Sequence, residues 1–359
     1  MGKSNKKDKQ KQTQQLPFVS VICVTYNRRP FFPAFFKSIQ LQDYPHSRFE
    51  VIIVDDGTDK IKDLVEKCGI PQVKYFALSE KLPLGKKRNY SHTLVDPRTK
   101  YITYFDDDDY QHPQRISHSV EMLEKNPKAL CAGASELYVY FKHIKQMYQF
   151  GPYGPNHATA GTFMFRKTLL DDTSYQDTAC LAEEKHFLKN YTVPFVQLNP
   201  LKNILVFSHE HNTFDKRKLL EQGPNQFAKP SERQIREFIT QPAEEFTYNF
   251  FMNEIDNLLK NYDPGDPKHK PDVLRQIKEI EIERARMMQQ QQQQMQQMQQ
   301  RQAAQIVLQR DGMPPLVLTP EQIMQIVKQQ QDQIQQLVMK CQMLEEQNKQ
   351  LLNVLGSKK

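Results

Sequence analysis

The strongest fold signal lies at residues 101–109, which read YITYFDDDD. Tyr101–Phe105 is a short run of aromatic and β-branched residues, typical of a buried strand, and four aspartates follow it directly. Two earlier stretches have the same form: residues 18–27 read FVSVICVTYN, and residues 49–57 read FEVIIVDDG. Each apolar run ends in polar or acidic residues. The repeated pattern predicts buried strands whose ends carry the polar chemistry of the protein.

Helical spacing separates these runs and places one more strand between them. We expect strands at Phe18–Val24, Phe49–Val54, Val73–Leu78 and Tyr101–Phe105, and helices at Phe31–Gln40, Ile61–Cys68 and Arg88–Val95. Alternation of strands and helices predicts parallel pairing in a doubly wound α/β layer. Ligands of such sheets bind beyond the carboxyl ends of the strands, so the polar strand ends should meet on one rim.

The aspartate run Asp106–Asp109 needs a compensating positive charge. Adjacent carboxylates raise one another's pKa unless a cation neutralises them, and hard oxygen ligands suit Mg²⁺ or Mn²⁺ shared with substrate phosphates. A solvated acidic loop is the alternative. The sequence has no GxxxxGK[ST] and no GxGxxG, the common glycine-rich motifs that bind phosphate. Lys86, Lys87 and Arg88 would then help to neutralise the charge of a bound phosphate. The alternative is that these three residues only begin an ordinary basic helix.

Together these motifs resemble the family 2 glycosyltransferases of the GT-A fold. The resemblance rests on VSVICVTYNR at 19–28, VIIVDDGT at 51–58, KRN at 87–89, and FDDDD at 105–109 with Pro113 beyond, and covers roughly residues 17–215. It implies a Rossmann-like, mostly parallel sheet with flanking helices. It also implies metal-dependent, inverting transfer of a sugar from a nucleoside-diphosphate sugar, most often UDP-linked, to an acceptor hydroxyl. A nucleotidyltransferase and a non-catalytic scaffold with a degenerate transferase domain are the rival hypotheses.

The resemblance also implies roles for individual residues. The nucleotide-sugar site would comprise Thr25, Tyr26 and Asn27 around the base, Asp55 or Asp56 hydrogen-bonded to the base, Lys87 and Arg88, and Asp106 and Asp107 facing the ribose or diphosphate. Asp108 would be the direct ligand of Mn²⁺ or Mg²⁺. Asp106 is a second candidate ligand, because four consecutive aspartates leave the register of the DxD motif open.

The family's catalytic base maps to an acidic pair further along the chain. Glu184 stands where the family has an aspartate, and Glu183 is the weaker candidate. Two glutamates at a helix start could instead only compensate the helix dipole. Residues 159–166, which read TAGTFMFR, resemble the family's border of the acceptor site, although a core strand would read the same way.

Two histidines could complete a metal site. His209 and His211 stand at alternate positions of an expected strand, so their side chains would point the same way. His211 is the preferred metal ligand and His209 the second choice. A histidine ligand would favour Mn²⁺ over Mg²⁺. An ordinary hydrogen-bonded histidine is the alternative for either position.

The C-terminal part has a different composition. A breaker cluster, DPGDP, occupies 263–267, and eleven of the fourteen residues at 289–302 are Gln, which suits either a helix or disorder. Thr319 begins a capping-box pattern with Gln322. Apolar residues then alternate at spacings of four and three as far as Leu355, with Asn348 interrupting one seam. This heptad pattern predicts a coiled coil that makes a homodimer or higher homo-oligomer. An amphipathic helix folded back on the catalytic domain is the alternative.

Composition bounds the remaining possibilities. Apolar residues make up 38% of 359 residues, and mean hydropathy is −0.72. No apolar run reaches 18 residues and no CxxC occurs, so we expect a cytoplasmic protein without a membrane span. Five Lys and one Asp in residues 1–11 supply +4 of the net charge of +7, which argues against nucleic acid as a partner. The expected organisation is a disordered basic tail (1–15), a GT-A domain (16–262), a charged and Gln-rich linker (263–318) and a coiled-coil helix (319–359). A nucleotide-sugar and a carbohydrate or glycosylated acceptor are the expected partners.

Overall fold

The computed structural model describes residues 16–213, 215–221, 227–303, 306–308 and 315–356. The basic tail predicted for residues 1–15 lies outside the described residues. The chain divides into two compact units, Met1–Glu279 and Ile280–Lys359. All residues expected to act in catalysis belong to the first unit.

The first unit is built on a seven-stranded sheet with the order β10-β6-β9-β4-β1-β2-β3. Its parallel half consists of β1 (Phe18–Thr25), β2 (Phe49–Asp55), β3 (Val73–Ala77) and β4 (Thr99–Tyr104). Short strands complete it: β9 (Met164–Arg166) runs antiparallel between β4 and β6 (Cys131–Gly133), and β10 (Phe195–Gln197) is parallel to β6. The predicted α/β layer with a mostly parallel sheet is therefore confirmed.

Helices flank this sheet, and all but the last of them were predicted from the sequence. They are α2 (Phe32–Gln40), α3 (Lys62–Lys67), α4 (Leu84–His92) and α5 (Arg115–Lys125). Phe32, Phe35 and Ile39 of α2 are buried in one core cluster with Val21 and Val51 of the central strands. Helix α4 begins at Leu84, ahead of the predicted start at Arg88, so Lys87 lies within the helix rather than before it.

A five-stranded sheet with the order β12-β8-β7-β11-β5 lies in the same unit. Its strands are β5 (Asp109–Gln111), β7 (Leu137–Phe141), β8 (Gln146–Phe150), β11 (Ile204–Ser208) and β12 (Ala228–Ser231). The chain leaves the large sheet at Tyr104 and enters the small one at Asp109, where Asp109 pairs with Val206 of β11. The aspartate run therefore bridges the two sheets, which fixes both of its ends.

The remaining helices are short until residue 271. They are α6 (Glu184–Phe187), α7 (Lys218–Glu221), α8 (Glu245–Asn249) and α9 (Ile255–Lys260), with a π-helical turn at Phe250–Glu254. Phe251 of that turn stacks on Phe207 of β11, with ring centroids 4.4 Å apart. The C-terminal elements are α10 (Pro271–Ala303), β13 (Ile306–Leu308), β14 (Leu316–Leu318) and α11 (Pro320–Gly356).

The end of the folded unit lies beyond the boundary that we expected at residue 262. The breaker cluster forms two successive 3-10 turns, Asp263–Gly265 and Pro267–His269, and these keep the chain on the domain instead of starting a linker. The amide of Asn27 donates a hydrogen bond to the carbonyl of Pro264 (2.9 Å), and the backbone N–H of Cys180 donates to Gln276 (2.7 Å). The first unit consequently runs to Glu279.

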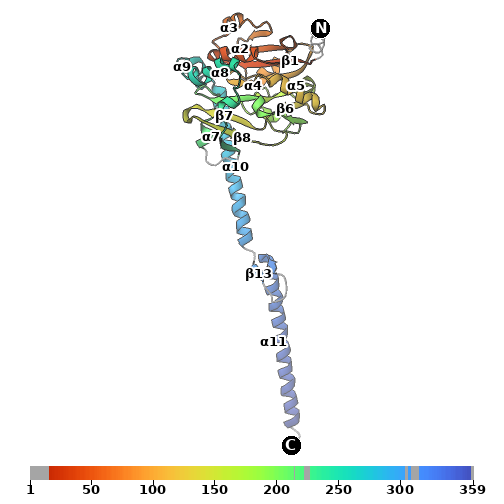
Figure 1. Ribbon diagram of the computed structural model, residues 1–359. Coiled ribbons are helices and arrows are strands. Elements are labelled where there is room, and N and C mark those ends of the chain that lie inside the picture. Colours follow the sequence, from red (N-terminus) through yellow and green to blue (C-terminus); the bar gives the residue numbers. More distant parts are fainter. Residues whose placement is uncertain (1–15, 214, 222–226, 304–305, 309–314, 357–359) are drawn as a thin grey trace. The chain divides into compact units, whose positions relative to one another are not determined.

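The described part of the C-terminal region is mainly helical. The Gln-rich tract belongs to α10 as far as residue 303, and α11 is one continuous helix (Figure 1). The capping box at its start is confirmed: Thr319 N–H donates to the Gln322 side chain (2.9 Å), and Gln322 N–H donates to Thr319 Oγ1 (3.3 Å). Self-association through a coiled coil stays a prediction. Within the described ranges, no helix has the length and apolar character needed to cross a bilayer.

Candidate active site

A cavity of about 380 Å³ opens at the carboxyl ends of β1 and β4, on the rim where the sequence places the chemistry. Predicted site residues that line it are Tyr26, Lys87, Arg88, Asp106, Asp107, Asp108, Glu183 and Glu184. Further charged residues in its lining are Arg28, Lys81, Asp109, Lys216, Lys270 and Asp272. Carboxylates and cations thus meet in one cavity, an arrangement that suits a charged ligand.

The aspartate run is held by contacts from the first strand end. Thr25 Oγ1 donates to Asp107 Oδ2 (2.6 Å), and Arg28 lies 3.9 Å from Asp107 and 3.5 Å from Asp108. Burial raises the pKa of Asp107 to about 7, although Arg28 opposes the shift. Burial acts on Asp108 too, but Arg28 and a hydrogen bond from His209 hold the pKa of Asp108 well below its usual range. Asp108 is therefore the ionised carboxylate that faces the cavity.

The donors present fit a divalent cation that is shared with a ligand. Among the described residues, no three His, Cys, Asp or Glu side chains are gathered closely enough to hold a metal ion by themselves. Mg²⁺ and Mn²⁺ need no such cage in nucleotide enzymes, because one or two carboxylates bind the ion together with substrate phosphates. Asp106 and Asp108 both line the cavity and supply the hard oxygen atoms for this mode.

His209, and not His211, contacts the aspartate run. Strand β11 ends at Ser208, so the alternation that would point both side chains the same way does not apply, and that expectation is wrong. His209 Nε2 lies 3.2 Å from Asp108 Oδ2, and burial lowers the pKa of His209 to about 4, which keeps the imidazole neutral. His211 instead lies against Tyr262, with ring centroids 6.3 Å apart.

The acidic pair at the start of α6 divides into two environments. Glu183 is buried and forms an ion pair with Arg88, whose guanidinium also lies 4.4 Å from the centroid of the Tyr104 ring. Glu184 lines the cavity, and burial followed by the charge of Glu183 raises the pKa of Glu184 to about 7. A carboxylate with this pKa can accept a proton near neutral pH. The ion pair of Glu183 therefore fixes the start of α6. Glu184 is the carboxylate that could accept a proton from a ligand in the cavity.

Several residues expected at the base site hold the loops together instead of lining the cavity. Asp55 accepts from the N–H groups of Gly57 (2.8 Å) and Ile61 (3.1 Å) and from the hydroxyl of Tyr75 (2.7 Å). Asn27, with φ of 52°, accepts from the N–H groups of Thr58 (2.8 Å) and Asp59 (2.9 Å). A Cβ at Gly57 would approach Asn27 N to 2.6 Å, so only glycine fits this crossing of the two loops.

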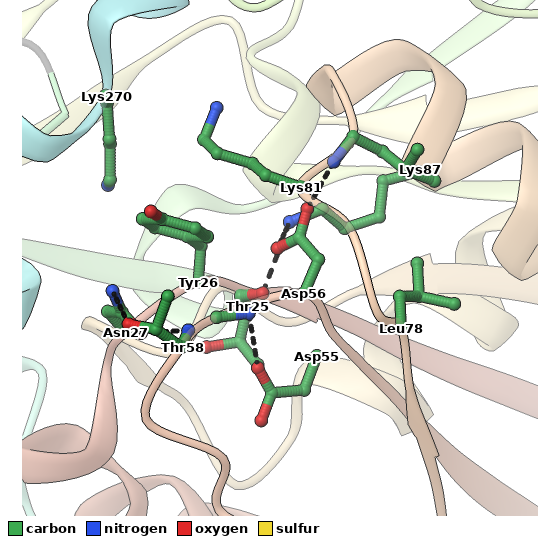
Figure 2. A network of polar contacts seen from close by, with 12 residues as sticks. Thr25, Tyr26, Asn27, Asp55, Asp56, Thr58, Leu78, Lys81, Lys87 and Lys270 are labelled. Atoms are coloured by element: carbon green, nitrogen blue, oxygen red, sulfur yellow. Dashed lines mark hydrogen bonds and ion pairs between the residues drawn. The ribbon is translucent and has the colours of Figure 1, made fainter.

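Asp56 forms a buried ion pair with Lys87, which lines the cavity. Lys87 Nζ makes an ion pair with Asp56 and donates to the carbonyl of Thr25 (3.2 Å), which locks α4 to the end of β1 (Figure 2). Asp56 also accepts from the N–H of Leu82 (2.8 Å). Burial lowers the pKa of Lys87, while the charge of Asp56 opposes the shift. The pair orders the rim and leaves the face of Tyr26 available in the cavity lining.

Sequence reasoning missed the basic residues that come from outside the motifs. Lys81 lies 5.3 Å and Lys270 6.0 Å from the centroid of the Tyr26 ring, and Figure 2 shows both near that side chain. Lys81 forms an ion pair with Asp272 at the start of α10. Burial lowers the pKa of Lys270 to about 7, with the Arg28 charge as the next cause. The sequence offers no local signal for these positions beyond the residue type.

Comparison with known proteins gives a family match over part of the chain. Residues 20–182 match the model described as glycosyl transferase family 2. An uncharacterised glycosyltransferase of Rickettsia conorii is 31% identical over 110 residues, which are 30% of this chain and 17% of that protein. The poly(ribitol-phosphate) β-N-acetylglucosaminyltransferase TarS of Staphylococcus aureus is 29% identical over 111 residues, covering 30% and 19%. The chain thus spans less than a fifth of the length of these curated relatives.

Solved structures with a related arrangement share little sequence. A crystal structure of S. aureus TarS residues 1–349 gives a TM-score of 0.43 at 19% identity, over 53% of this chain and 60% of that one. The mannosyltransferase PcManGT of Pyrobaculum calidifontis, solved with GDP-Man and Mn²⁺, gives 0.45 at 14% identity, over 59% and 66%.

Proposed function

We propose that this protein is a metal-dependent, inverting glycosyltransferase, because residues 20–182 match the model of glycosyl transferase family 2. Its donor in this proposal is a nucleoside-diphosphate sugar, with UDP as the nucleotide, and its acceptor is a hydroxyl of a carbohydrate or glycosylated molecule. The observation that carries the proposal is the shared cavity, where Asp108 is ionised and Glu184 has a pKa of about 7. The names of the relatives from R. conorii and S. aureus give the same class of reaction.

The donor would lie along the rim of the large sheet. Tyr26 offers an aromatic face to the base, and the cations of the lining offset the negative charge of the diphosphate. Asp55, Asp56 and Asn27 would act through the loops that they order, because their side chains are already engaged there. The sugar would then lie in the same cavity as Glu184.

Asp108 and Asp106 are the groups that would hold Mn²⁺ or Mg²⁺ together with the diphosphate. The neutral imidazole of His209, which contacts Asp108, would orient that carboxylate. The ion would supply Lewis-acid stabilisation of the charge that develops on the departing diphosphate. Of the two histidines, His209 and not His211 contacts Asp108, so His211 is not a ligand in this proposal.

Glu184 would act as the general base. Its carboxylate accepts the proton of the acceptor hydroxyl while that oxygen attacks the anomeric carbon and the bond to the diphosphate breaks. A single displacement of this kind inverts the configuration at that carbon. Glu183 and Arg88 hold the start of α6 in place through their buried ion pair, which sets the position of the Glu184 carboxylate.

The released product separates this reaction from that of a nucleotidyltransferase. The protein should release UDP from a UDP-sugar when Mn²⁺ and an acceptor are present, as measured by a coupled assay for free UDP. Release of pyrophosphate from UTP and a sugar phosphate would identify the protein as a nucleotidyltransferase instead. Release of neither product would favour the scaffold hypothesis.

We further propose that α11 joins two or more copies of the chain. The heptad positions Ile334, Leu337 and Leu344 are 59%, 63% and 51% exposed in the single chain. A stripe of exposed apolar residues at this spacing is stabilised by burial against a second helix of the same pattern. A second copy of α11 meets that requirement.

A further inference from the structure

Two buried cations meet at one hydroxyl group inside the cavity. Arg28 Nη2 lies 3.3 Å and Lys270 Nζ 3.1 Å from Thr213 Oγ1, and each donates a hydrogen bond to it. Arg28 is 5% and Lys270 6% exposed. All three residues line the cavity, although they come from sequence positions more than 50 residues apart. Like charges are thus held together where water can screen them only weakly.

The hydrogen-bond donors of these two cations are not all paired within the protein. Arg28 Nη1 is buried and has no hydrogen-bond partner, and the contacts of Arg28 with Asp107 and Asp108 are long, at 3.9 and 3.5 Å. Within the described part of the chain, no carboxylate lies within ion-pair distance of Lys270. A buried ammonium and an orphan guanidinium N–H are costly unless an anion binds them. Their free donors therefore indicate a ligand with several acceptor oxygens.

The segment that carries Lys270 is fixed in place over the rim. The hydroxyl of Tyr26 donates to the carbonyl of His269 (3.4 Å), Lys81 pairs with Asp272, and Gln276 accepts from the N–H of Leu181 (3.0 Å). Figure 2 shows Lys270 extending toward the group around Tyr26 and Asn27. Lys270, which directly precedes α10, thus lines the cavity, so the cavity is bounded by residues well beyond the family match.

We propose that Arg28, Thr213 and Lys270 form a binding site for the diphosphate of the donor. Phosphate oxygens can accept from Arg28 Nη1, from Lys270 Nζ and from the hydroxyl of Thr213 at once, which satisfies the donors left open in the cavity. The residues from 263 to 276 then act as a strap that completes the donor site. This inference rests on the proposed function, and it adds to it two binding residues, Thr213 and Lys270, outside residues 20–182.

The test compares ligands with and without phosphate. Binding of UDP and of uridine to the whole chain is measured by titration calorimetry, with uridine determined by competition against UDP. Lys270→Met keeps the length of the side chain and removes its charge. This variant should weaken UDP binding about tenfold or more, as expected for a hydrogen bond to a charged group, and leave uridine binding within twofold of the wild type. Thr213→Val should show a smaller loss in the same direction, and Lys270→Arg should recover most of the affinity.

The matched control is Lys278→Met, which removes the same charge from an exposed position of α10. It should bind both ligands as the wild type does. The inference is overturned if Lys270→Met binds UDP normally, or if uridine and UDP lose affinity to the same extent, because the lysine then only supports the strap. A wild-type protein that binds neither ligand would instead refute the proposed function, and with it the donor site.

Discussion

Glu184→Gln should remove both the sugar transfer and its dependence on pH near neutrality. The substitution keeps the size of the side chain and its place at the start of α6, but an amide cannot accept the proton of the acceptor hydroxyl. Loss of a general base lowers kcat by about 10²–10⁴-fold. The binding of UDP, which Glu184 does not contact in our proposal, should be unchanged.

The magnitude of the pH effect follows from the raised pKa. With a pKa of about 7, Glu184 is mostly protonated at low pH and becomes a competent base as the pH rises. About 10% of the carboxyl is ionised one unit below that pKa and about 90% one unit above it, so kcat should rise about tenfold across that interval. An unperturbed glutamate would give a flat profile there, because it is ionised throughout.

The assay is UDP release at saturating donor and acceptor, measured from about pH 5.5 to about pH 8.5. Glu66→Gln, at an exposed position of α3, is the matched control and should keep the wild-type profile. The role of Glu184 is refuted if Glu184→Gln retains kcat within a few-fold of the wild type. A wild-type profile that is flat through pH 7 would contradict the raised pKa as the source of the base.

Three further changes test other parts of the molecule. Asp108→Ala should abolish Mn²⁺-dependent turnover while thermal unfolding stays close to that of the wild type; normal turnover would exclude Asp108 as a metal ligand. Arg88→Met leaves the buried carboxylate of Glu183 unpaired and should lower the free energy of unfolding in urea by about 3–5 kcal/mol, a loss that adding Glu183→Gln should largely reverse. Leu337→Lys places a charge in the predicted seam of α11 and should reduce the molar mass measured by light scattering to that of a single chain. An unchanged mass would place any self-association elsewhere.

The parallel half of the large sheet could be predicted because each of its strands is a recognisable apolar run in the sequence. The runs that form β1, β2 and β4 are apolar on both faces and stop at polar residues, so their pairing and their common rim follow from the pattern. β9 and β10 have three residues each, too few for a period to emerge, and the antiparallel direction of β9 depends on its neighbours β4 and β6. The small sheet was not predicted because most of its strands pair antiparallel, outside the alternation of strands and helices that marks the large sheet.

The candidate site divides in a similar way. The aspartate run and the acidic pair lie beside strong local motifs, so their presence at the rim could be expected. The choice between His209 and His211 depends on where β11 ends, and no residue near Ser208 marks that end. Lys270 lies at the end of a breaker cluster that resembles a linker in sequence. Only the contacts of the folded chain bring it to the cavity.

Release of UDP from a panel of UDP-sugars tests the central claim most directly. The whole chain is incubated with each UDP-sugar and Mn²⁺, and free UDP is measured beside the same reactions with Asp108→Ala and with a chelator. We predict that the wild-type protein releases UDP from at least one sugar donor, and that both the substitution and the chelator abolish the release. No release from any nucleotide-sugar, or equal release by Asp108→Ala, would contradict the assignment of this cavity as a glycosyltransferase site.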